Sequence, residues 1–245
     1  MRLHDKIAIV TGAGSGFGAG IARKFAAEGA RVVVADINLE AAEAVARDIG
    51  GTAVGCNVAD RAQVEALRDA ALALGPVDIL VNNAGVTHLP AATEDVTEAD
   101  FDRIVAVNMK AIFHMTQVFV PGLKSRRTGA ILNIASTAGV SPRPRLSWYN
   151  ASKGWVITAT RALAVELAPA GIRVNALNPV AGETPLLKSF MGEDTPEVRA
   201  KFLSTIPLGR FSTPEDMGNA ACFLCSDEAS MITGVAMEVD GGRCI

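Results

Sequence analysis

The stretch KIAIVTGAGSGFGAGIARKFAAE, which runs from Lys6 to Glu28, decides the fold. Its first part is an apolar run of strand length that ends at Thr11, and apolar residues at helical spacing follow Gly18. A strand that passes through a glycine-rich turn into a helix brings free backbone N–H groups and the positive end of a helix dipole to one place. The stretch therefore predicts a strand, a phosphate-binding turn and a helix.

The spacing of the glycines narrows the kind of turn. The fingerprint G-x-G-x-x-G fails when counting begins at Gly12, because Phe17 occupies the last required position. The spacing Gly12-x-x-x-Gly16-x-Gly18 fits instead, and it meets the same need for close approach of the backbone to a pyrophosphate. A P-loop is excluded because no Gly-Lys-Ser/Thr closes the turn.

Asp36 stands at the end of the second apolar run, 18 residues beyond Gly18. An acidic side chain at this place accepts hydrogen bonds from ribose hydroxyls, and it repels a 2′-phosphate. Neither the turn nor Ile37 and Asn38 supply a lysine or arginine that would offset the negative charge. The sequence therefore predicts a site that prefers NAD over NADP. An aspartate that only caps the next helix is the alternative.

Apolar runs of strand length alternate with helical patterns along the whole chain. This alternation predicts an α/β fold, a Rossmann-like doubly wound parallel sheet of about seven strands with helices on both faces. We expect residues 1–245 to form one domain, in which residues 180–213 form a small helical substrate lid. Strands are predicted at Lys6–Thr11, Arg31–Ala35, Thr52–Cys56, Val77–Val81, Ala130–Ala135, Arg173–Leu177 and Val235–Val239. Helices are predicted at Phe17–Glu28, Leu39–Ile49, Arg61–Leu74, Glu98–Lys124, Trp148–Leu167 and Pro214–Ser226.

Composition and charge exclude several classes of protein. The net charge is −3 and the lysines and arginines are scattered, so no nucleic-acid partner is expected. No apolar run approaches the roughly 18 residues of a membrane span, and the absence of a signal-peptide pattern predicts a cytoplasmic location. The cysteines are too scattered for a disulfide framework, and Cys222-x-x-Cys225 lies inside a helical pattern. The histidines lack metal-ligand spacing, so no metal is expected.

Tyr149 is the only tyrosine, and Lys153 follows it by four residues on a predicted helix. Residues at this spacing face one another. An ammonium group beside a phenol favours the phenolate and lowers the phenol pKa from its ordinary value of about 10. Such a phenol can exchange a proton with an alcohol or carbonyl oxygen. The spacing alone also fits a half-buried aromatic beside a solvated lysine. Other parts of the chain are needed to distinguish the two interpretations.

Five ordered signals make the chain resemble the short-chain dehydrogenase/reductase family over essentially its full length. They are Thr11–Gly18, Asp36, Asn82-Asn83-Ala84-Gly85, Ser136 with Tyr149 and Lys153, and Asp240-Gly241-Gly242. The resemblance implies that NAD carries the hydride, that Tyr149 is the general acid/base and that Lys153 assists it and holds the nicotinamide ribose. It also implies that Ser136 positions the substrate oxygen and that Asn108 helps to hold a proton-relay water. Members of the family usually form tetramers, so a homotetramer or homodimer is expected.

By the same resemblance, the cofactor site draws on several segments of the chain. Three positions depart from the usual family pattern: Asn57 replaces an aspartate, Val180 a glycine, and Gly182 a valine or isoleucine. The Asn57 carbonyl is still expected to accept from the adenine amino group, and the Gly182 peptide to donate to the nicotinamide amide. The expected cofactor residues are Gly12, Ser15, Gly16, Phe17, Gly18, Asp36, Ile37, Asn57, Val58, Asn83, Ala84, Gly85, Tyr149, Lys153, Pro179, Val180, Gly182 and Thr184.

The substrate is expected to be a small alcohol or carbonyl compound. The segments Ser141–Trp148 and Gly182–Pro196 look similar to a subgroup that includes the dehydrogenase of 4-(hydroxymethyl)benzenesulfonate, which indicates a secondary or benzylic alcohol. Arg143 and Arg145 are candidates for an anionic substrate group, with a surface or subunit contact as the alternative. The expected substrate contacts are His88, Ser136, Trp148, Leu187, Phe190 and Met191.

The sequence favours an NAD-dependent alcohol dehydrogenase or carbonyl reductase, and three alternatives stay open. The first is a 3-oxoacyl-(acyl-carrier-protein) reductase, a role that normally uses NADPH and so conflicts with Asp36. The second is a binding protein that senses NAD without turnover, which the intact set of Ser136, Tyr149 and Lys153 opposes. The third is an extended sugar epimerase, for which 245 residues are too few to supply the usual extra substrate region.

Overall fold

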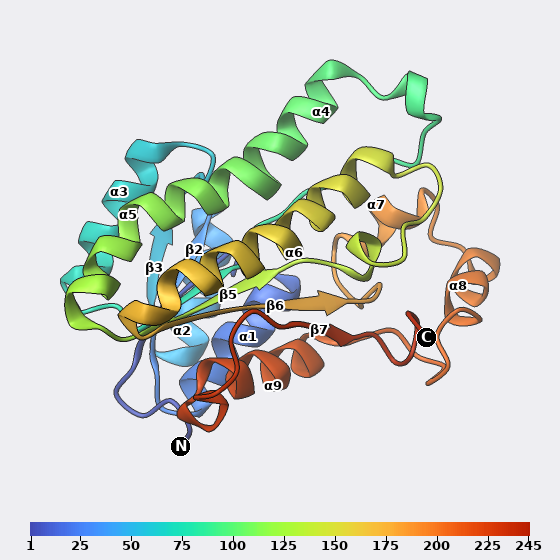
Figure 1. Cartoon of the computed structure of the whole chain (residues 1–245). Helices are drawn as coiled ribbons and strands as arrows, with labels where there is room; N and C mark the ends of the chain where they lie inside the picture. The colour runs from blue at the N-terminus through green and yellow to red at the C-terminus, as the bar shows by residue number, and fades with distance from the viewer.

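Seven parallel strands form a single sheet at the centre of the molecule, in the order β3-β2-β1-β4-β5-β6-β7 (Figure 1). The computed structural model describes residues 1–245. The strand order reverses between β1 and β4, and such a reversal opens a crevice at the carboxyl ends of the strands. The strands are β1 (Ile7–Thr11), β2 (Arg31–Asp36), β3 (Thr52–Gly55), β4 (Ile79–Asn82), β5 (Gly129–Ile134), β6 (Ile172–Pro179) and β7 (Ala236–Val239).

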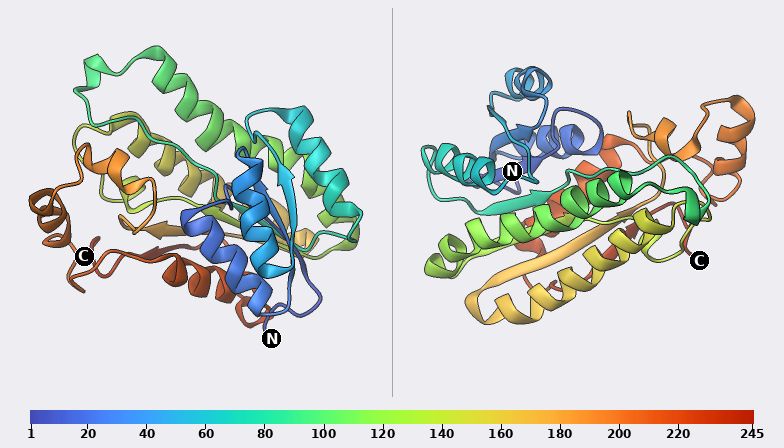
Figure 2. Two further views of the ribbon diagram at one scale, coloured as in Figure 1. Left: turned by 180° about the vertical axis from the view of Figure 1, so that it is seen from behind. Right: turned by 90° about the horizontal axis from the view of Figure 1, so that it is seen from above.

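Helices cover both faces of this sheet because the strands present apolar side chains in both directions. In β1, Ile7 and Ile9 join one buried layer and Ala8 and Val10 join the other. The layer with Ile7 is covered by α3, α5 and α6, and the layer with Ala8 by α1, α2 and α9 (Figure 2). The helices are α1 (Gly16–Ala27), α2 (Leu39–Ile49), α3 (Arg61–Leu72), α4 (Glu98–Ile104), α5 (Ala111–Arg126), α6 (Ser147–Leu167), α7 (Leu187–Met191), α8 (Pro196–Leu203) and α9 (Pro214–Cys225).

These elements confirm the predicted fold class, and all the predicted strands and all but one of the predicted helices are present with small shifts at their ends. Local signals explain several boundaries. Asn38 caps α2 by accepting a hydrogen bond from the backbone of Ala41 (3.2 Å), and Gly50 ends the helix at φ +64°. Thr213 and Asp216 form a reciprocal capping box at the start of α9.

The long helical stretch Glu98–Arg126 differs from its prediction as one α-helix. A π-helical segment, Val105–Lys110, separates α4 from α5. Such segments are rare and mostly single turns inside α-helices, so the apolar pattern of the whole stretch still predicted one α-helix. By length and composition alone this helix could cross a membrane, although no uninterrupted apolar run in the sequence is long enough to predict a span. Half of its most apolar window is nevertheless buried inside this fold.

The lid segment, residues 180–213, lies beside the carboxyl end of the sheet and carries α7 and α8 (Figure 1). It has a small apolar core of its own, formed by Val180, Leu187, Ile206 and Phe211. Gly182 and Ser212 form an isolated parallel bridge that closes its base. The lid segment is therefore an internally packed unit.

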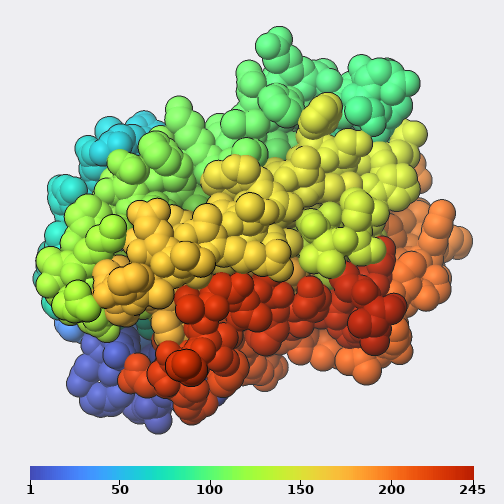
Figure 3. All heavy atoms as spheres, in the orientation of Figure 1, coloured from blue at the N-terminus to red at the C-terminus, as the bar shows by residue number.

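The end of the chain also approaches the pocket side of the molecule. After β7, the C-terminal residues lie against the loop that precedes α6 (dark red and yellow-green in Figure 3). Arg243 Nη1 donates a hydrogen bond to Ser141 Oγ at 3.2 Å. This contact joins residues that are 102 positions apart in the chain.

Candidate active site

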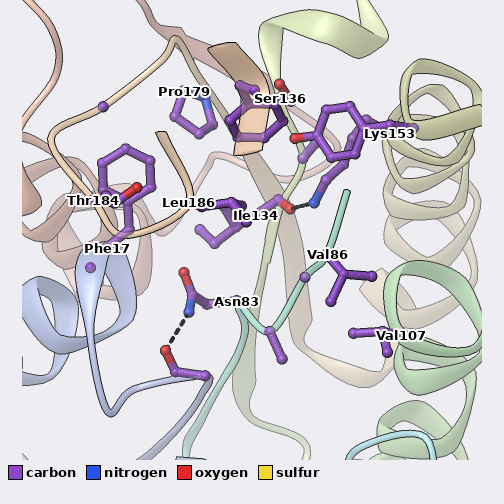
Figure 4. A pocket seen from close by; sticks show the side chains of 18 of the residues that line it. Phe17, Asn83, Val86, Val107, Ile134, Ser136, Lys153, Pro179, Thr184 and Leu186 are labelled. Carbon is purple, nitrogen blue, oxygen red and sulfur yellow. Dashed lines mark hydrogen bonds between the residues drawn. The ribbon is translucent and has the colours of Figure 1, made fainter. Parts of the chain in front are cut away.

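A large pocket lies at the carboxyl ends of β1, β4, β5 and β6 and continues beneath the lid segment (Figure 4). Most of the residues predicted to bind cofactor or substrate line this one pocket. They are Gly12, Ser15, Gly16, Phe17, Asp36, Ile37, Asn57, Val58, Asn83, Ala84, Gly85, Ser136, Tyr149, Lys153, Pro179, Val180, Gly182, Thr184 and Phe190.

The glycine turn makes one wall of the pocket and has no room for side chains at key positions. Gly12 adopts φ +60°, and a Cβ there would lie 2.9 Å from Ala84 Cα. A Cβ on Gly18 would lie 2.3 Å from the Gly12 carbonyl oxygen, so this glycine packs beneath the turn and does not line the pocket. Ser15 begins α1 without a side-chain cap, which leaves the first N–H groups of the helix free for an anion. The turn fits a pyrophosphate.

Asn83 holds the turn in place. Its Nδ2 donates to the carbonyl oxygens of Thr11 (2.8 Å) and Gly12 (3.0 Å), and Figure 4 shows this side chain reaching toward the turn. The Thr11 hydroxyl in turn accepts from the backbone N–H groups of Asn83 (3.0 Å) and Ala84 (3.1 Å). The Asn83 side chain therefore ties the end of β4 to the turn of β1.

Asp36 is fixed at the end of β2 by two backbone donors. Its Oδ2 accepts from the N–H of Gly14 and its Oδ1 from that of Asn38, both at 2.9 Å. The only cations that line the pocket are Arg143 and Lys153, and neither belongs to the turn or to the residues after β2. A carboxylate with its remaining lone pairs toward the pocket suits ribose hydroxyls and opposes a 2′-phosphate.

Asn57 lines the pocket, but its side chain is already engaged. Its Oδ1 accepts from the backbone N–H of Ala59 at 3.1 Å, and its own N–H donates to Gln63 Oε1 at 2.8 Å. One lone pair of Oδ1 remains for an adenine amino group. The residues present thus fit a dinucleotide along the glycine turn, Asp36 and the loop after β3.

Tyr149 and Lys153 lie in the first turns of α6 and are both buried, with 5% of each residue exposed. Burial raises the pKa of Tyr149 to about 12, while the Ser136 hydroxyl and the Arg143 charge lower it. Burial also lowers the pKa of Lys153 to about 8, and its Nζ donates to the Ile134 carbonyl oxygen at 2.8 Å (Figure 4).

The predicted lowering of the Tyr149 pKa by Lys153 is therefore wrong for this structure. The lysine lies 5.8 Å from the centroid of the tyrosine ring, and its ammonium is directed to a backbone carbonyl. Burial disfavours the charged phenolate more than the Ser136 hydroxyl and the Arg143 guanidinium favour it, so the pKa of Tyr149 is raised.

Ser136 follows β5 and lines the pocket beside this pair. Its Oγ accepts a hydrogen bond from the backbone N–H of Ala138 at 3.1 Å, which caps a short 3-10 turn, Thr137–Gly139. The hydroxyl proton can donate to Tyr149, whose pKa it lowers, or to a substrate oxygen. Phe190 from α7 packs edge-on against Tyr149, with ring centroids 5.1 Å apart. The site thus has an apolar wall beside a hydroxyl donor and a phenol.

Asn108 lies in the π-helical segment and does not line the pocket. Its Oδ1 accepts from the N–H of Val86 (2.8 Å), and its Nδ2 donates to the Val86 carbonyl oxygen (2.9 Å) and to Ser152 Oγ (3.0 Å). Ser152 Oγ donates to the carbonyl oxygen of Tyr149 at 2.7 Å. The Asn108 side chain therefore connects the loop after β4 to the helix that carries Tyr149 and Lys153.

Four residues predicted to contact substrate do not line the pocket. Trp148 precedes Tyr149 by one helical position, so it points elsewhere and packs edge-on against Phe101, with centroids 5.3 Å apart. Leu187 belongs to the core of the lid segment, and Met191 packs against that core. His88 is buried, with its Nδ1 2.7 Å from the Leu89 carbonyl oxygen.

Other side chains form the substrate end of the pocket in their place. Val86 lines it, as does Arg143, which was already a candidate for an anionic substrate group. The lining residues that were not predicted are Ala138, Leu146, Pro185, Leu186 and Phe202. A helical signal existed for Leu146, which lies three residues before Tyr149 and shares its buried cluster. No local signal distinguishes Leu186 from Leu187, because their orientations depend on how the lid segment folds.

The cysteine pair of α9 faces the core. Cys222 and Cys225 are buried in the apolar layer that also contains Ala8. Burial raises the pKa of Cys222, and it raises that of Cys225 to about 12. Neither thiol is a reactive thiolate in this setting.

Comparison with known proteins places this geometry in a family. A family model described as enoyl-(acyl carrier protein) reductase matches residues 12–243. The chain belongs to the short-chain dehydrogenase/reductase family, and it is an oxidoreductase that acts on CH–OH groups with a nicotinamide dinucleotide.

Several relatives match this chain over nearly its full length. It is 49% identical to 4-formylbenzenesulfonate dehydrogenase of Comamonas testosteroni, and the match covers 100% of both sequences. The crystal structure of a 3-ketoacyl-(acyl-carrier-protein) reductase from Brucella melitensis, complexed with NADH, is 52% identical, with a TM-score of 0.95 over 99% of this chain and 100% of that one. A 7α-hydroxysteroid dehydrogenase complexed with NADH and 7-oxo glycochenodeoxycholic acid is 40% identical, with a TM-score of 0.92 over 98% of this chain and 95% of that one.

Proposed function

We propose that the protein is an NAD-dependent dehydrogenase that interconverts a secondary or benzylic alcohol and its carbonyl compound. One observation carries this proposal: Ser136, Tyr149 and Lys153 meet in the same pocket as the glycine turn and Asp36. A hydroxyl donor and a phenol thus lie in the pocket that accommodates a dinucleotide. NAD held along the glycine turn and at Asp36 would supply the hydride acceptor for the carbinol carbon.

The side chains of the chain itself handle the proton. Ser136 donates a hydrogen bond to the carbinol oxygen and orients it, and Tyr149 removes the hydroxyl proton as the carbonyl group forms. In the reverse direction Tyr149 returns that proton. Burial raises the pKa of Tyr149, and a protonated Lys153 can lower it. To do so, its Nζ turns from the Ile134 carbonyl oxygen toward the phenol. The positive charge of oxidised nicotinamide favours the phenolate as well.

The preference for NAD follows from the fixed carboxylate of Asp36 and from the absence of cations around it in the pocket. The two solved neighbours contain NADH, which supports the same choice. Steady-state rates with NAD and NADP on one alcohol substrate test it. Equal kcat/KM values for the two cofactors would contradict this assignment.

The substrate class is supported by the shape and chemistry of the pocket. Leu146, Leu186, Phe190 and Phe202 offer an apolar surface next to Tyr149, which suits a bulky or aromatic alcohol. The name of the 49%-identical relative, 4-formylbenzenesulfonate dehydrogenase, points to the same class. A screen of aliphatic, cyclic, benzylic and β-hydroxyacyl alcohols, read by the absorbance of the NADH formed, tests the proposal. Failure of every alcohol other than the β-hydroxyacyl ones would contradict it.

A second candidate is a 3-oxoacyl-(acyl-carrier-protein) reductase that uses NADH. The Brucella melitensis structure with this description and with bound NADH favours it. The two candidates differ in the length of the substrate, because an acyl carrier protein delivers its acyl group on a long flexible arm. Reduction of a 3-oxoacyl thioester faster than of an aromatic aldehyde would favour the reductase.

We also propose that the protein assembles as a homotetramer or homodimer. Exposed apolar side chains on the outer helices support an interface, because Phe113 of α5 is 51% exposed and Trp155 and Val165 of α6 are 37% and 79% exposed. Sedimentation velocity measures the state directly. A monomer at micromolar concentration would contradict the proposal.

A further inference from the structure

The substrate end of the pocket contains an arginine that has no acidic partner. Arg143 lies in the loop before α6 and lines the pocket, and no salt bridge within the chain includes it. The only acidic residue that lines the pocket, Asp36, ends β2, which lies three strand positions from β5. Arg143 is therefore a half-buried cation without a counterion in the chain.

Packing holds this guanidinium in place. It lies over the ring of Phe202 from α8, with 4.3 Å between Cζ and the ring centroid. Its own carbonyl oxygen accepts a hydrogen bond from Asn150 Nδ2 at 2.7 Å, which ties its backbone to α6. A planar guanidinium stacked on an aromatic ring keeps its edge free for two parallel hydrogen bonds to a carboxylate or sulfonate.

A second arginine, Arg243, lies near it and adds a further positive charge. Arg243 donates from Nη1 to Ser141 Oγ, while its Nε is buried and unpartnered. Burial, and then the charge of Arg243, lower the pKa of Arg143. The adjacent acid, Asp240, is engaged by the N–H groups of Gly242 (2.9 Å) and Cys244 (2.8 Å). Neighbouring like charges that are partly desolvated are costly unless an anion joins them.

We propose that Arg143, with Arg243 near it, receives an anionic group of the substrate, so that the enzyme acts on alcohols that carry a carboxylate or sulfonate away from the carbinol. The inference rests on the proposed dehydrogenase function. The carbinol lies at Ser136 and Tyr149, the apolar body of the substrate packs against Leu146 and Phe190, and the anion meets Arg143 at the lid segment. Arg145, the other candidate, is exposed outside this pocket and donates to the Pro90 carbonyl oxygen at 3.3 Å.

The test compares two alcohols of the same shape and different charge, 4-(hydroxymethyl)benzoate and 4-(hydroxymethyl)benzamide. The ratio of their kcat/KM values cancels effects common to both, including any change in the pKa of Tyr149. We expect the wild-type enzyme to favour the benzoate, and Arg143→Met to lower this ratio by about 10- to 100-fold, the range for loss of a hydrogen bond to a charged group. Arg143→Lys should retain part of the ratio, and Arg145→Met, the control on the same loop, should leave it unchanged.

A wild-type ratio near one, or equal losses on both alcohols in Arg143→Met, would overturn the proposal and leave Arg143 as a packing partner of Phe202. Thermal shift with benzoate and with benzamide gives a readout that needs no turnover. If benzoate raises the Tm of the wild type and not that of Arg143→Met, the anion site is supported. This holds even if neither alcohol is oxidised, a result that would contradict the proposed reaction and not the site. Equal thermal shifts from benzoate and benzamide would count against the site.

Discussion

The ring of Phe17 occupies the space that a side chain at position 182 would need. A Cβ built on Gly182 would lie 2.2 Å from Phe17 Cζ and 2.5 Å from Phe17 Cε1. The glycine turn after β1 and the base of the lid segment are therefore in direct contact. This contact explains the departure at Gly182, where the family often has a valine or isoleucine: the large residue is supplied by the turn instead.

The contact predicts that Gly182→Val is destabilising and that a smaller residue at position 17 rescues it. Overpacking of this kind costs about 1–3 kcal/mol. We expect Gly182→Val to lower Tm and raise the KM for NAD, and the double variant Phe17→Ala/Gly182→Val to recover much of both. Gly122→Ala is the control, because a Cβ on Gly122 meets no atom within 4 Å. Additive effects of the two changes would show that the positions do not compensate each other.

Replacing Tyr149 by phenylalanine removes the hydroxyl and keeps the ring that packs against Phe190. We expect turnover to fall by about 10²- to 10⁴-fold, the usual contribution of general acid–base catalysis, with little change in NADH affinity. Stopped-flow rates and NADH fluorescence titration measure the two quantities. Turnover near the wild-type level in Tyr149→Phe would remove Tyr149 from the mechanism.

The pH dependence of alcohol oxidation follows from the protonation state of the same residue. Oxidation needs the phenolate, and burial raises the pKa of Tyr149 to about 12, so the reactive fraction grows as pH rises below that value. Initial rates should therefore increase from neutral to alkaline pH. Because the Arg143 charge lowers the Tyr149 pKa, Arg143→Met should move the profile to higher pH. A flat profile between about pH 7 and 10 would argue against a tyrosine base.

Asp36→Asn preserves the shape of the side chain and removes its charge. The amide carbonyl can still accept from Gly14 or Asn38, whereas the repulsion of a 2′-phosphate is lost. We expect the ratio of kcat/KM for NAD over NADP to fall by about 10-fold or more, the range for hydrogen bonds to charged groups. An unchanged ratio would mean that other residues select the cofactor.

The sequence predicted the fold well because its signals are periodic and local. Alternating buried faces such as Ile7 and Ala8 mark the strands, and the strand–helix alternation then limits the topology. The glycine turn, Asp36 and the Tyr149–Lys153 pair could be located because each lies at the end of a strand or on the first turns of a helix. These positions are fixed by the sheet.

The substrate end could not be predicted in the same way. Trp148 and Leu187 lie only two and one positions along the chain from the pocket residues Leu146 and Leu186. Which of them faces the cavity depends on packing within the lid segment and against α4, contacts between distant parts of the chain. The pKa of Tyr149 was mispredicted for a related reason, because spacing along a helix reveals a neighbour's identity and not its burial or the direction of its ammonium group.

Asn108 is expected to help hold a proton-relay water, and in this structure its side chain makes three hydrogen bonds, two with Val86 and one with Ser152. We expect Asn108→Ala to cost about 1–3 kcal/mol of unfolding free energy, because it leaves buried backbone groups of Val86 unpaired. Turnover should fall together with Tm, since the loop after β4 and the start of α6 lose their connection. Asn108→Asp keeps the acceptor for the Val86 N–H and loses both donors, so its Tm should lie between those of the wild type and Asn108→Ala. A variant with unchanged Tm and strongly reduced kcat would instead favour a direct role of the side chain in proton transfer.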